Sequence, residues 1–406
     1  MSVEITTLVE KYNTPLYVYD FNNITNRYDE LKDAFSGKKS LVAYAVKSNS
    51  NLAVIRHLAN LGAGADCVSI GEVRRALKAG VKKYKIIFSG VGKKDSEIRE
   101  ALQEDILLIN LESEAEMKRV AMIAKELNVE ARISIRVNPN VDPKTHPYIS
   151  TGLHENKFGV SIDMAKRMYI YAKKSENLNP VGVHFHIGSQ LTELAPITEA
   201  CGIVADLVRS LDAIGIEIKF FDVGGGLGVV YDNETTIRPD DYAKAILSKI
   251  KGLDMTILSE PGRYMMANSG IFLTKVLYEK VNGDKRFVVV DGAMNDLIRP
   301  SLYNAYHKIE AVQKEGETSS ADVVGPVCES GDFLGKDVEL PIMDHNDILV
   351  VHSAGAYGFT MSSNYNTRGR SAEVAILDGK DYLIRERETF EDQIRLEENC
   401  DTSWQS

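Results

Sequence analysis

The sequence predicts an α/β fold: a parallel (β/α)8 barrel of the TIM type, joined to a mainly-β domain that is a sandwich or barrel. Short β-type runs alternate with helical segments between residues 41 and 260, and this alternation indicates parallel strand pairing. Eight such units in about 220 residues match a closed barrel better than an open doubly wound sheet. After about residue 262 the pattern changes to strand-like runs with few helices between them, which indicates a second domain.

The eight expected barrel strands are short apolar runs, several of which end on a polar residue. They are residues 41–46, 64–69, 85–90, 105–110, 131–137, 181–187, 219–224 and 255–260. Segments between them have helical spacing of apolar residues, and 51–62 and 69–80 also end in glycine, which favours a helix C-cap. The barrel domain is therefore expected over residues 22–262.

Residues 1–21 and 263–406 are expected to form the β domain. Its strand-like runs are residues 271–281, 285–292, 322–327, 347–355, 372–379 and 381–388. The segment 14–20 could be a strand of either domain. The polar run 313–320 is expected to be an exposed loop.

Composition and charge exclude several classes of protein. The formal net charge is −10, which argues against nucleic acid or an anionic membrane as the main partner, since both require a basic surface. No stretch approaches the roughly 18 apolar residues of a membrane span, and the acidic opening segment does not resemble a signal peptide. The four cysteines are widely spaced, so neither a disulfide framework nor a zinc site is expected, and a reducing cytoplasm fits best.

Polar residues gather where the barrel strands are expected to end, and the chemistry of such barrels lies at that C-terminal mouth. The residues are Lys47, Asp66, Asn110, Arg136, Asn138, His186, Gly224, Gly225, Gly226 and Glu260. A lysine at a strand end is, taken alone, usually a solvated surface group. Together these side chains would face one cavity.

Two of these motifs allow more than one interpretation. The run "DVGGGLG" lacks the dinucleotide-binding pattern; its bare amides could hold a phosphate just before a helix, or it could be a tight strand-to-helix turn. In "HFHIGSQ", His184 and His186 are expected on one face of a strand, where they could bind a metal in a hydrolase. That alternative requires further ligands, and no other histidine falls at a barrel strand end, so no metal is expected. His186 could instead lie against a flat cofactor, and Ser189 could bind an anion.

The motif "SEPGRY" adds Glu260 and Arg263, which alone would be a loop with a surface ion pair. Beside Lys47 and the glycine run they suggest a more specific combination. Lysine forms an imine with an aldehyde, glycines bind a phosphate, a ring stacks, and a carboxylate pairs with a heterocyclic nitrogen. These are the groups that bind pyridoxal 5′-phosphate.

Nine segments, in order along nearly the whole chain, carry a family resemblance. They are "YAVKSN", "GADCVS", "THPYISTGLHENKFGV", "HFHIGSQ", "DVGGGLG", "SEPGRY", "MNDLIRPSLY", "GPVCESGD" and "GAYGFTMSSNYN". With them the chain resembles the diaminopimelate decarboxylases, which are pyridoxal phosphate enzymes of the alanine-racemase-like class, fold type III. The sequence departs from the family in having Gly369 where proline is usual, in a loop that this change is expected to loosen.

The resemblance implies a role for each matching position. Lys47 attaches to the cofactor, His186 stacks on its ring, Asp66 supports the lysine, and Glu260 pairs with the pyridine nitrogen. The cofactor-binding set implied is Lys47, Asp66, His186, Ser189, Gly224, Gly225, Gly226, Glu260, Gly262, Arg263 and Tyr357. The substrate-binding set implied is Arg263, Arg299, Tyr303, Glu329 and Tyr357. The catalytic residues implied are Lys47 and the proton donor Cys328, which without its motif would be interpreted as a small buried hydrophobic residue.

The resemblance further implies decarboxylation of meso-2,6-diaminopimelate to L-lysine and CO2, the last step of bacterial lysine biosynthesis. A carboxylate such as Glu260 keeps the pyridine nitrogen protonated, which favours CO2 loss. Arg299 would bind the distal carboxylate of the substrate, with help from Tyr303, and Glu329 would bind the distal ammonium. Cys328 and Glu329 would reach the site of a neighbouring subunit, so a homodimer with shared active sites is expected.

Two other functions remain open on the sequence alone. The chain could act on another amino acid or polyamine precursor, although such substrates would leave Arg299 unpaired at a cost of roughly 1–3 kcal/mol. It could also be a catalytically silent regulatory relative, against which the presence of both Lys47 and Cys328 argues.

Overall fold

The computed structural model describes residues 3–142, 157–398 and 400. The chain divides into two compact units. The first, called the barrel unit, comprises the described parts of 25–230 and 234–265. The second, called the sheet unit, comprises the described parts of 1–24, 231–233 and 266–406.

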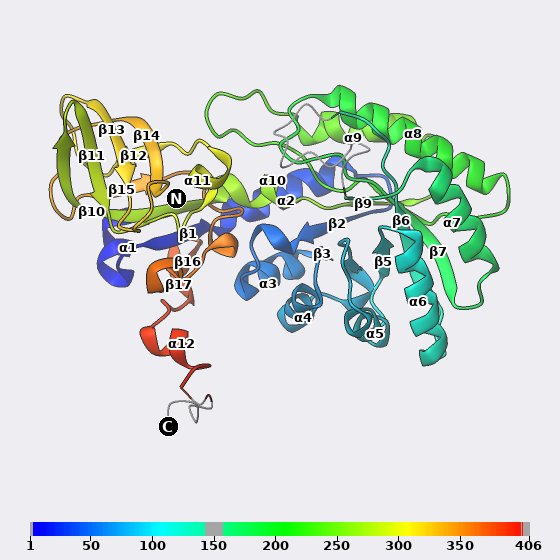
Figure 1. The fold of residues 1–406 in the computed structure, drawn as a ribbon. Coiled ribbons are helices and arrows are strands. Elements are labelled where there is room, and N and C mark those ends of the chain that lie inside the picture. Colours follow the sequence, from blue (N-terminus) through cyan, green and yellow to red (C-terminus); the bar gives the residue numbers. More distant parts are fainter. Residues whose placement is uncertain (1–2, 143–156, 399, 401–406) are drawn as a thin grey trace. The chain divides into compact units, whose positions relative to one another are not determined.

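Within the described residues, eight parallel strands close the barrel unit (Figure 1). They are β2 (Ser40–Ala45), β3 (Gly64–Cys67), β4 (Ile86–Phe88), β5 (Leu108–Leu111), β6 (Ala131–Arg136), β7 (Leu178–His184), β8 (Phe220–Asp222) and β9 (Thr256–Ser259). Pairing of β2 with β9 completes the ring. The barrel fold is confirmed, and each of the eight expected runs overlaps one of these strands.

Helices alternate with the barrel strands along the chain and lie outside them (Figure 1). They are α2 (Phe21–Ala34), α3 (Leu52–Leu61), α4 (Ile70–Ala79), α5 (Asp95–Gln103), α6 (Glu114–Leu127), α7 (Ile162–Lys174), α8 (Leu194–Asp212) and α9 (Pro239–Lys249). The predicted glycine caps are confirmed: Gly62 and Gly80 end α3 and α4 with φ of 104° and 97°. Among the described residues, none of the helices has the length and apolar character to span a membrane.

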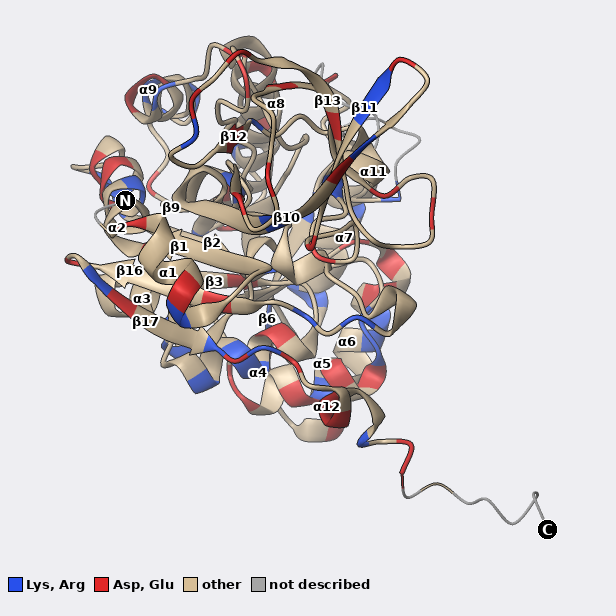
Figure 2. Ribbon diagram, turned by 90° about the vertical axis from the view of Figure 1, so that its left-hand side faces the viewer, with Lys and Arg blue, Asp and Glu red and all other residues tan. Residues whose placement is uncertain are grey.

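The inside of the barrel is apolar, whereas the outer face of its helices carries charged residues. A buried apolar cluster fills the interior, formed by Ala43, Ile87, Leu108, Val181 and Leu258. The helices α4, α5 and α6 carry both acidic and basic residues (Figure 2). Arg74 of α4 forms an ion pair with Glu100 of α5 at 2.6 Å. Exposed pairs of this kind contribute little stability, so the fold depends mainly on its apolar core.

The sheet unit holds a nine-stranded sheet within the described residues. Its strands are β1 (Leu16–Asp20), β10 (Gly270–Asn282), β11 (Lys285–Val290), β12 (Ile309–Ala311), β13 (Ser319–Val324), β14 (Phe333–Leu340), β15 (Ile348–Val351), β16 (Ala372–Leu377) and β17 (Lys380–Arg385). β1 pairs antiparallel with β10 and parallel with β16, so the N-terminal strand belongs to this unit. The short helices here are α1 (Ile5–Tyr12), α11 (Arg299–Tyr303) and α12 (Phe390–Ile394).

Two strands of this sheet are absent from the sequence-based prediction. β12 is only three residues long, and Gly335, Lys336 and Asp337 interrupt the apolar pattern of β14. The expected loop 313–320 is also too long, since β13 already begins at Ser319. Both differences arise because strand pairing, rather than apolar alternation, determines where these edge segments begin and end.

Candidate active site

Lys47 lies at the mouth of the barrel, in a short 3-10 turn (Val46–Ser48) that directly follows β2. Its Nζ donates a hydrogen bond to Asp66 Oδ2 at 3.0 Å. The Lys47 side chain is 38% exposed, whereas that of Asp66 is fully buried. Burial raises the pKa of Asp66, as does the negative charge of Glu260, while Lys47 opposes both effects. The amine is therefore oriented by a buried carboxyl but remains accessible from the mouth.

The turn that carries Lys47 packs tightly against the segment after β9. Ala45 N donates to Pro261 O at 3.1 Å. A Cβ on Gly262 would lie 2.9 Å from the Cβ of Ser48, closer than side chains normally approach. Glycine at 262 thus brings the segment carrying Glu260 next to the turn carrying Lys47.

Glu260 is buried at the end of β9, where its backbone N donates to Gly224 O at 2.7 Å. One carboxylate oxygen, Oε2, lies 3.3 Å from His184 Nε2. The other, Oε1, is buried without a hydrogen-bond partner among the described residues. Burial acts to raise the pKa of Glu260, but the attraction of His184 and of Lys47 outweighs it and lowers the pKa well below its usual value. Glu260 is therefore an anion with one oxygen available for a ligand.

His184 and His186 do not share a face of one strand, and that expectation is wrong. β7 ends at His184, and His186 lies in the following loop. His186 Nδ1 accepts a hydrogen bond from Gly225 N at 3.2 Å. Burial lowers the pKa of His186 well below its usual value, and the charges of Arg136 and Lys47 lower it further. His186 is thus a neutral ring held in one orientation.

Asp222 is absent from the predicted site, and His184 was predicted only as a possible metal ligand. With Glu260 they offer three buried ligand atoms within 4.8 Å of one another. The expectation that no further potential ligand accompanies His184 at other strand ends is therefore wrong, because two carboxyls, Asp222 and Glu260, lie at the ends of the next two strands. Asp222 could have been found from its place at the end of the expected strand 219–224.

The glycine run differs from its expected form in two respects. Gly224 N donates to Asp222 Oδ1 at 2.9 Å and Gly225 N donates to His186, so these two amides are not bare. No helix follows directly, because α9 begins only at Pro239. A Cβ on Gly225 would lie 2.3 Å from Glu260 O, and one on Gly226 would lie 2.7 Å from Gly188 O. These glycines bring three strand-end loops into close contact.

Ser189 and Arg263 lie together beside this run. Arg263 Nε donates to Ser189 Oγ at 3.0 Å, and Arg263 is buried. A guanidinium, a hydroxyl and a close-packed glycine backbone form a suitable environment for a phosphate.

The remaining polar strand-end residues have structural contacts. Asn110 Nδ2 donates to Ser89 Oγ at 3.0 Å. Arg136 donates to Glu112 Oε1 at 2.9 Å. Asn138 Oδ1 accepts from Asn140 N at 2.9 Å. These contacts fix the loops of the mouth.

The other predicted site residues belong to the sheet unit. Arg299 and Tyr303 lie at the two ends of α11, one helical turn apart. Arg299 is buried, donates from Nε to His307 Nε2 at 3.3 Å and lies over the ring of Tyr231. Tyr357 follows β15 with a φ of 56°, a conformation that non-glycine residues seldom adopt.

Cys328 and Glu329 are exposed on the turn between β13 and β14. Cys328 N donates to Asn366 Oδ1 at 2.8 Å, and Asp332 Oδ2 accepts from Val327 N at 2.7 Å. Cys328 is therefore not a small buried hydrophobic residue, and its turn is held in a defined shape. Of the quoted family segments, "THPYISTGLHENKFGV" lies outside the described residues up to position 156.

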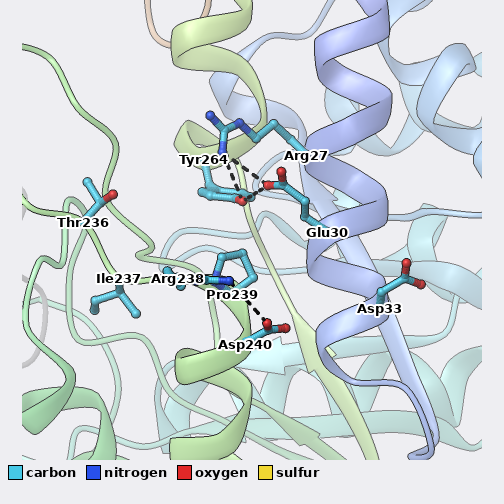
Figure 3. A pocket seen from close by; sticks show the side chains of 9 residues that line it. All are labelled: Arg27, Glu30, Asp33, Thr236, Ile237, Arg238, Pro239, Asp240 and Tyr264. Atoms are coloured by element: carbon cyan, nitrogen blue, oxygen red, sulfur yellow. Dashed lines mark hydrogen bonds and ion pairs between the residues drawn. The ribbon is translucent and has the colours of Figure 1, made fainter.

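A cavity of about 440 Å³ opens elsewhere on the barrel unit (Figure 3). It is lined by Arg27 and Glu30 of α2, by Tyr264, and by the segment 236–240. Tyr264 OH donates to Glu30 Oε2 at 2.6 Å, and Arg27 pairs with Glu30 at 3.3 Å. Because its central charges pair with each other and it contains none of the mouth residues, this cavity is not assigned to the active site.

Comparison with known proteins places the chain in a family. The family described as "Pyridoxal-dependent decarboxylase, pyridoxal binding domain" matches residues 21–267. The chain is 63% identical to the diaminopimelate decarboxylase of Campylobacter jejuni, over 96% of this chain and 98% of that protein. It is 56% identical to the diaminopimelate decarboxylase of Helicobacter pylori strain J99, over 96% and 97%. The chain belongs to the diaminopimelate decarboxylase family.

Solved structures of the family have the same fold. The diaminopimelate decarboxylase of Helicobacter pylori, complexed with L-lysine, superposes with a TM-score of 0.95 at 54% identity, over 97% of this chain and 99% of that one. The diaminopimelate decarboxylase of M. jannaschii, in co-complex with L-lysine, gives 0.92 at 40%, over 96% and 93%. The predicted family, fold class and pyridoxal phosphate cofactor are confirmed.

The residues of the barrel mouth fit this cofactor of the diaminopimelate decarboxylase family. Lys47 offers an accessible amine. Glu260 Oε1 is a buried anionic oxygen without a hydrogen-bond partner among the described residues. A Cβ at Gly224, Gly225 or Gly226 would lie within 2.3–2.7 Å of a backbone oxygen of a neighbouring loop, so the backbone here is close-packed. An amine, an acceptor for a ring N–H and a close-packed backbone are what the aldehyde, nitrogen and phosphate of pyridoxal phosphate require.

Proposed function

We propose that this enzyme decarboxylates meso-2,6-diaminopimelate to L-lysine and CO2. The observation that carries the proposal is the presence of an accessible Lys47 amine and an anionic Glu260 at one barrel mouth. When bound, pyridoxal phosphate supplies an aldehyde that reacts with amines and a ring that takes up the electron pair left by CO2. Two highly similar relatives are named diaminopimelate decarboxylase, which supports the choice of substrate.

Each barrel residue has a proposed task toward the cofactor. Lys47 attaches to it and Asp66 orients the Lys47 amine. Glu260 Oε1 would accept a hydrogen bond from the ring N–H of the cofactor, and the neutral His186 ring would lie against its face. The phosphate would be bound by Ser189, Gly224, Gly225, Gly226 and Tyr357, with Arg263 nearby, and Gly262 would also contact the cofactor.

Glu260 explains why CO2 loss is the favoured reaction. A protonated pyridine nitrogen makes the ring a stronger electron acceptor, and an anionic carboxylate stabilises that proton. The attraction of His184 and of the Lys47 ammonium group holds Glu260 in its anionic form.

The sheet unit supplies the proposed substrate contacts. Arg299 binds the distal carboxylate, with Tyr303 adding a hydroxyl group, and Glu329 binds the distal ammonium. Arg263 and Tyr357 contact the substrate near the cofactor. A substrate without the distal carboxylate would leave the buried Arg299 charge unpaired, which is the proposed basis of specificity.

Cys328 is the proposed proton donor to the carbon from which CO2 leaves. Such a transfer accelerates a reaction by about 10²–10⁴-fold. Cys328 and Glu329 are both exposed on one turn, which supports a role in the active site of a neighbouring subunit. We therefore propose a homodimer with shared sites. The four cysteines are all free, in agreement with a cytoplasmic location.

The test is a direct comparison of substrates. Purified enzyme is supplied with pyridoxal phosphate and either meso-diaminopimelate, ornithine, arginine or lysine, and CO2 release is measured. We expect rapid CO2 release and stoichiometric L-lysine from diaminopimelate alone. Equal or faster release from any of the other three would contradict the proposed substrate.

A further inference from the structure

Three side chains on adjacent strands meet beneath the barrel mouth. His184 ends β7, Asp222 ends β8, and Glu260 follows β9. His184 pairs in register with Asp222 across the two strands. This register brings an imidazole and two carboxyl groups into one small space.

The cluster is closed to solvent and its polar atoms face each other. His184, Asp222 and Glu260 are 1%, 1% and 6% exposed. His184 Nδ1 and Nε2, Asp222 Oδ2 and Glu260 Oε1 make no aligned hydrogen bond among the described residues. Buried polar atoms in folded proteins are nearly always hydrogen-bonded. Four such atoms without a partner in one place therefore indicate that added protons and a bound ligand supply the missing hydrogen bonds.

The three groups cannot all carry their usual charges here. Two anionic carboxyls within 4.8 Å of each other and out of water repel strongly. Burial and the charge of Glu260 raise the pKa of Asp222 well above its usual value. His184 also contacts Glu260, with Nε2 3.3 Å from Oε2.

We propose that His184 and Asp222 are positioning residues that hold Glu260 as an anion, with Oε1 directed at the nitrogen of the cofactor ring. His184 donates from Nε2 to Glu260 Oε2. Asp222 is a neutral acid, whose Oδ1 accepts from Gly224 N and whose proton lies on Oδ2. This inference rests on the proposed role of Glu260 toward the cofactor.

The arrangement assigns the two Glu260 oxygens different tasks. Oε2 is occupied by the protein, which leaves Oε1 as the oxygen that can accept the ring N–H. Because Asp222 is neutral, it does not compete with Glu260 as a second anion for the His184 N–H. The cluster therefore sets both the charge and the orientation of Glu260.

Nuclear magnetic resonance of ¹⁵N-labelled pyridoxal phosphate tests the proposal, because the ring nitrogen shift reports its protonation in the absence of substrate. Wild type and His184→Gln, which keeps an N–H donor, are expected to show a protonated nitrogen at pH 8. His184→Phe is expected to show a neutral nitrogen, with kcat about 10²-fold lower and KM changed less than about threefold. An unchanged nitrogen signal in His184→Phe would overturn the proposal.

A second variant decides the question if His184→Phe does not fold. In infrared difference spectra of the cofactor-free proteins, wild type minus Asp222→Asn should show a protonated carboxyl band. Asp222→Asn should also keep the protonated ring nitrogen, because asparagine reproduces a neutral acid. Absence of the band, or loss of the nitrogen signal, would overturn the proposal.

The controls separate this proposal from the proposed function. A pH series of the nitrogen signal must take into account all ionisable groups that act on Glu260, namely Lys47, Asp66, His184, His186 and Asp222.

If the enzyme failed to decarboxylate diaminopimelate while the predicted nitrogen signals were intact, the proposed substrate would be rejected and the roles of His184 and Asp222 would stand.

Discussion

Gly225 offers the sharpest test of how the active-site loops pack. A Cβ at this position would lie 2.3 Å from the carbonyl oxygen of Glu260, whereas ordinary contacts of a Cβ begin at 3.4 Å. The Glu260 backbone would therefore have to retreat by about 1 Å in Gly225→Ala. Overpacking of this size costs typically 1–3 kcal/mol of folding free energy, and a 1 Å displacement of a catalytic group can cost about 10²-fold in rate.

Gly92→Ala is the matched control. Gly92 belongs to the same unit, has no heavy atom within 4 Å of a built Cβ, and does not require a left-handed backbone. We expect Gly225→Ala to lower the free energy of unfolding in urea by about 1–3 kcal/mol and kcat by about 10²-fold. Gly92→Ala should change neither by much. If Gly225→Ala matched wild type in both measurements, the packing argument would be refuted.

Three further predictions concern the sheet unit. Cys328→Ala should bind the cofactor with its visible absorbance intact and lose about 10²–10⁴-fold in kcat; undiminished lysine formation would remove Cys328 from its role. Arg299→Lys should lower kcat/KM for diaminopimelate by about 10–200-fold and the slow turnover of lysine by less than threefold, and equal losses on both substrates would contradict a specificity role. Burial raises the pKa of Asp296 from 3.8 to about 6, which corresponds to about 3 kcal/mol. A raised carboxyl pKa in the folded protein means that stability is lost as the pH rises. Between pH 4 and 7, the free energy of unfolding of wild type in urea should therefore fall by about this much more than that of Asp296→Asn. If both proteins lost stability equally over this range, the prediction would be refuted.

The barrel was predicted because short apolar runs alternate with segments of helical spacing, two of which also end in a glycine C-cap. Gly62 and Gly80 show how closely local sequence sets helix ends. The edge strand β14 could not be predicted in this way, since its residues are half exposed and its existence depends on pairing with β13.

The candidate site was predicted unevenly, for a similar reason. Lys47, Asp66 and Glu260 stand at strand ends, so the fold alone brings them to one mouth. The association of His184 with Asp222 depends on the register of β7 against β8, which no single strand sequence specifies. The amides of Gly224 and Gly225 are occupied because Asp222 and His186 fold back on them, which the glycine motif does not reveal.

The central claim is that the Lys47 amine binds the cofactor at the barrel mouth. Borohydride reduction of the enzyme loaded with pyridoxal phosphate, followed by peptide mass mapping, measures this directly. We predict that the phosphopyridoxyl mass appears on the peptide containing Lys47 and is lost in Lys47→Ala. Stable labelling of a different lysine in the wild-type enzyme would contradict the account.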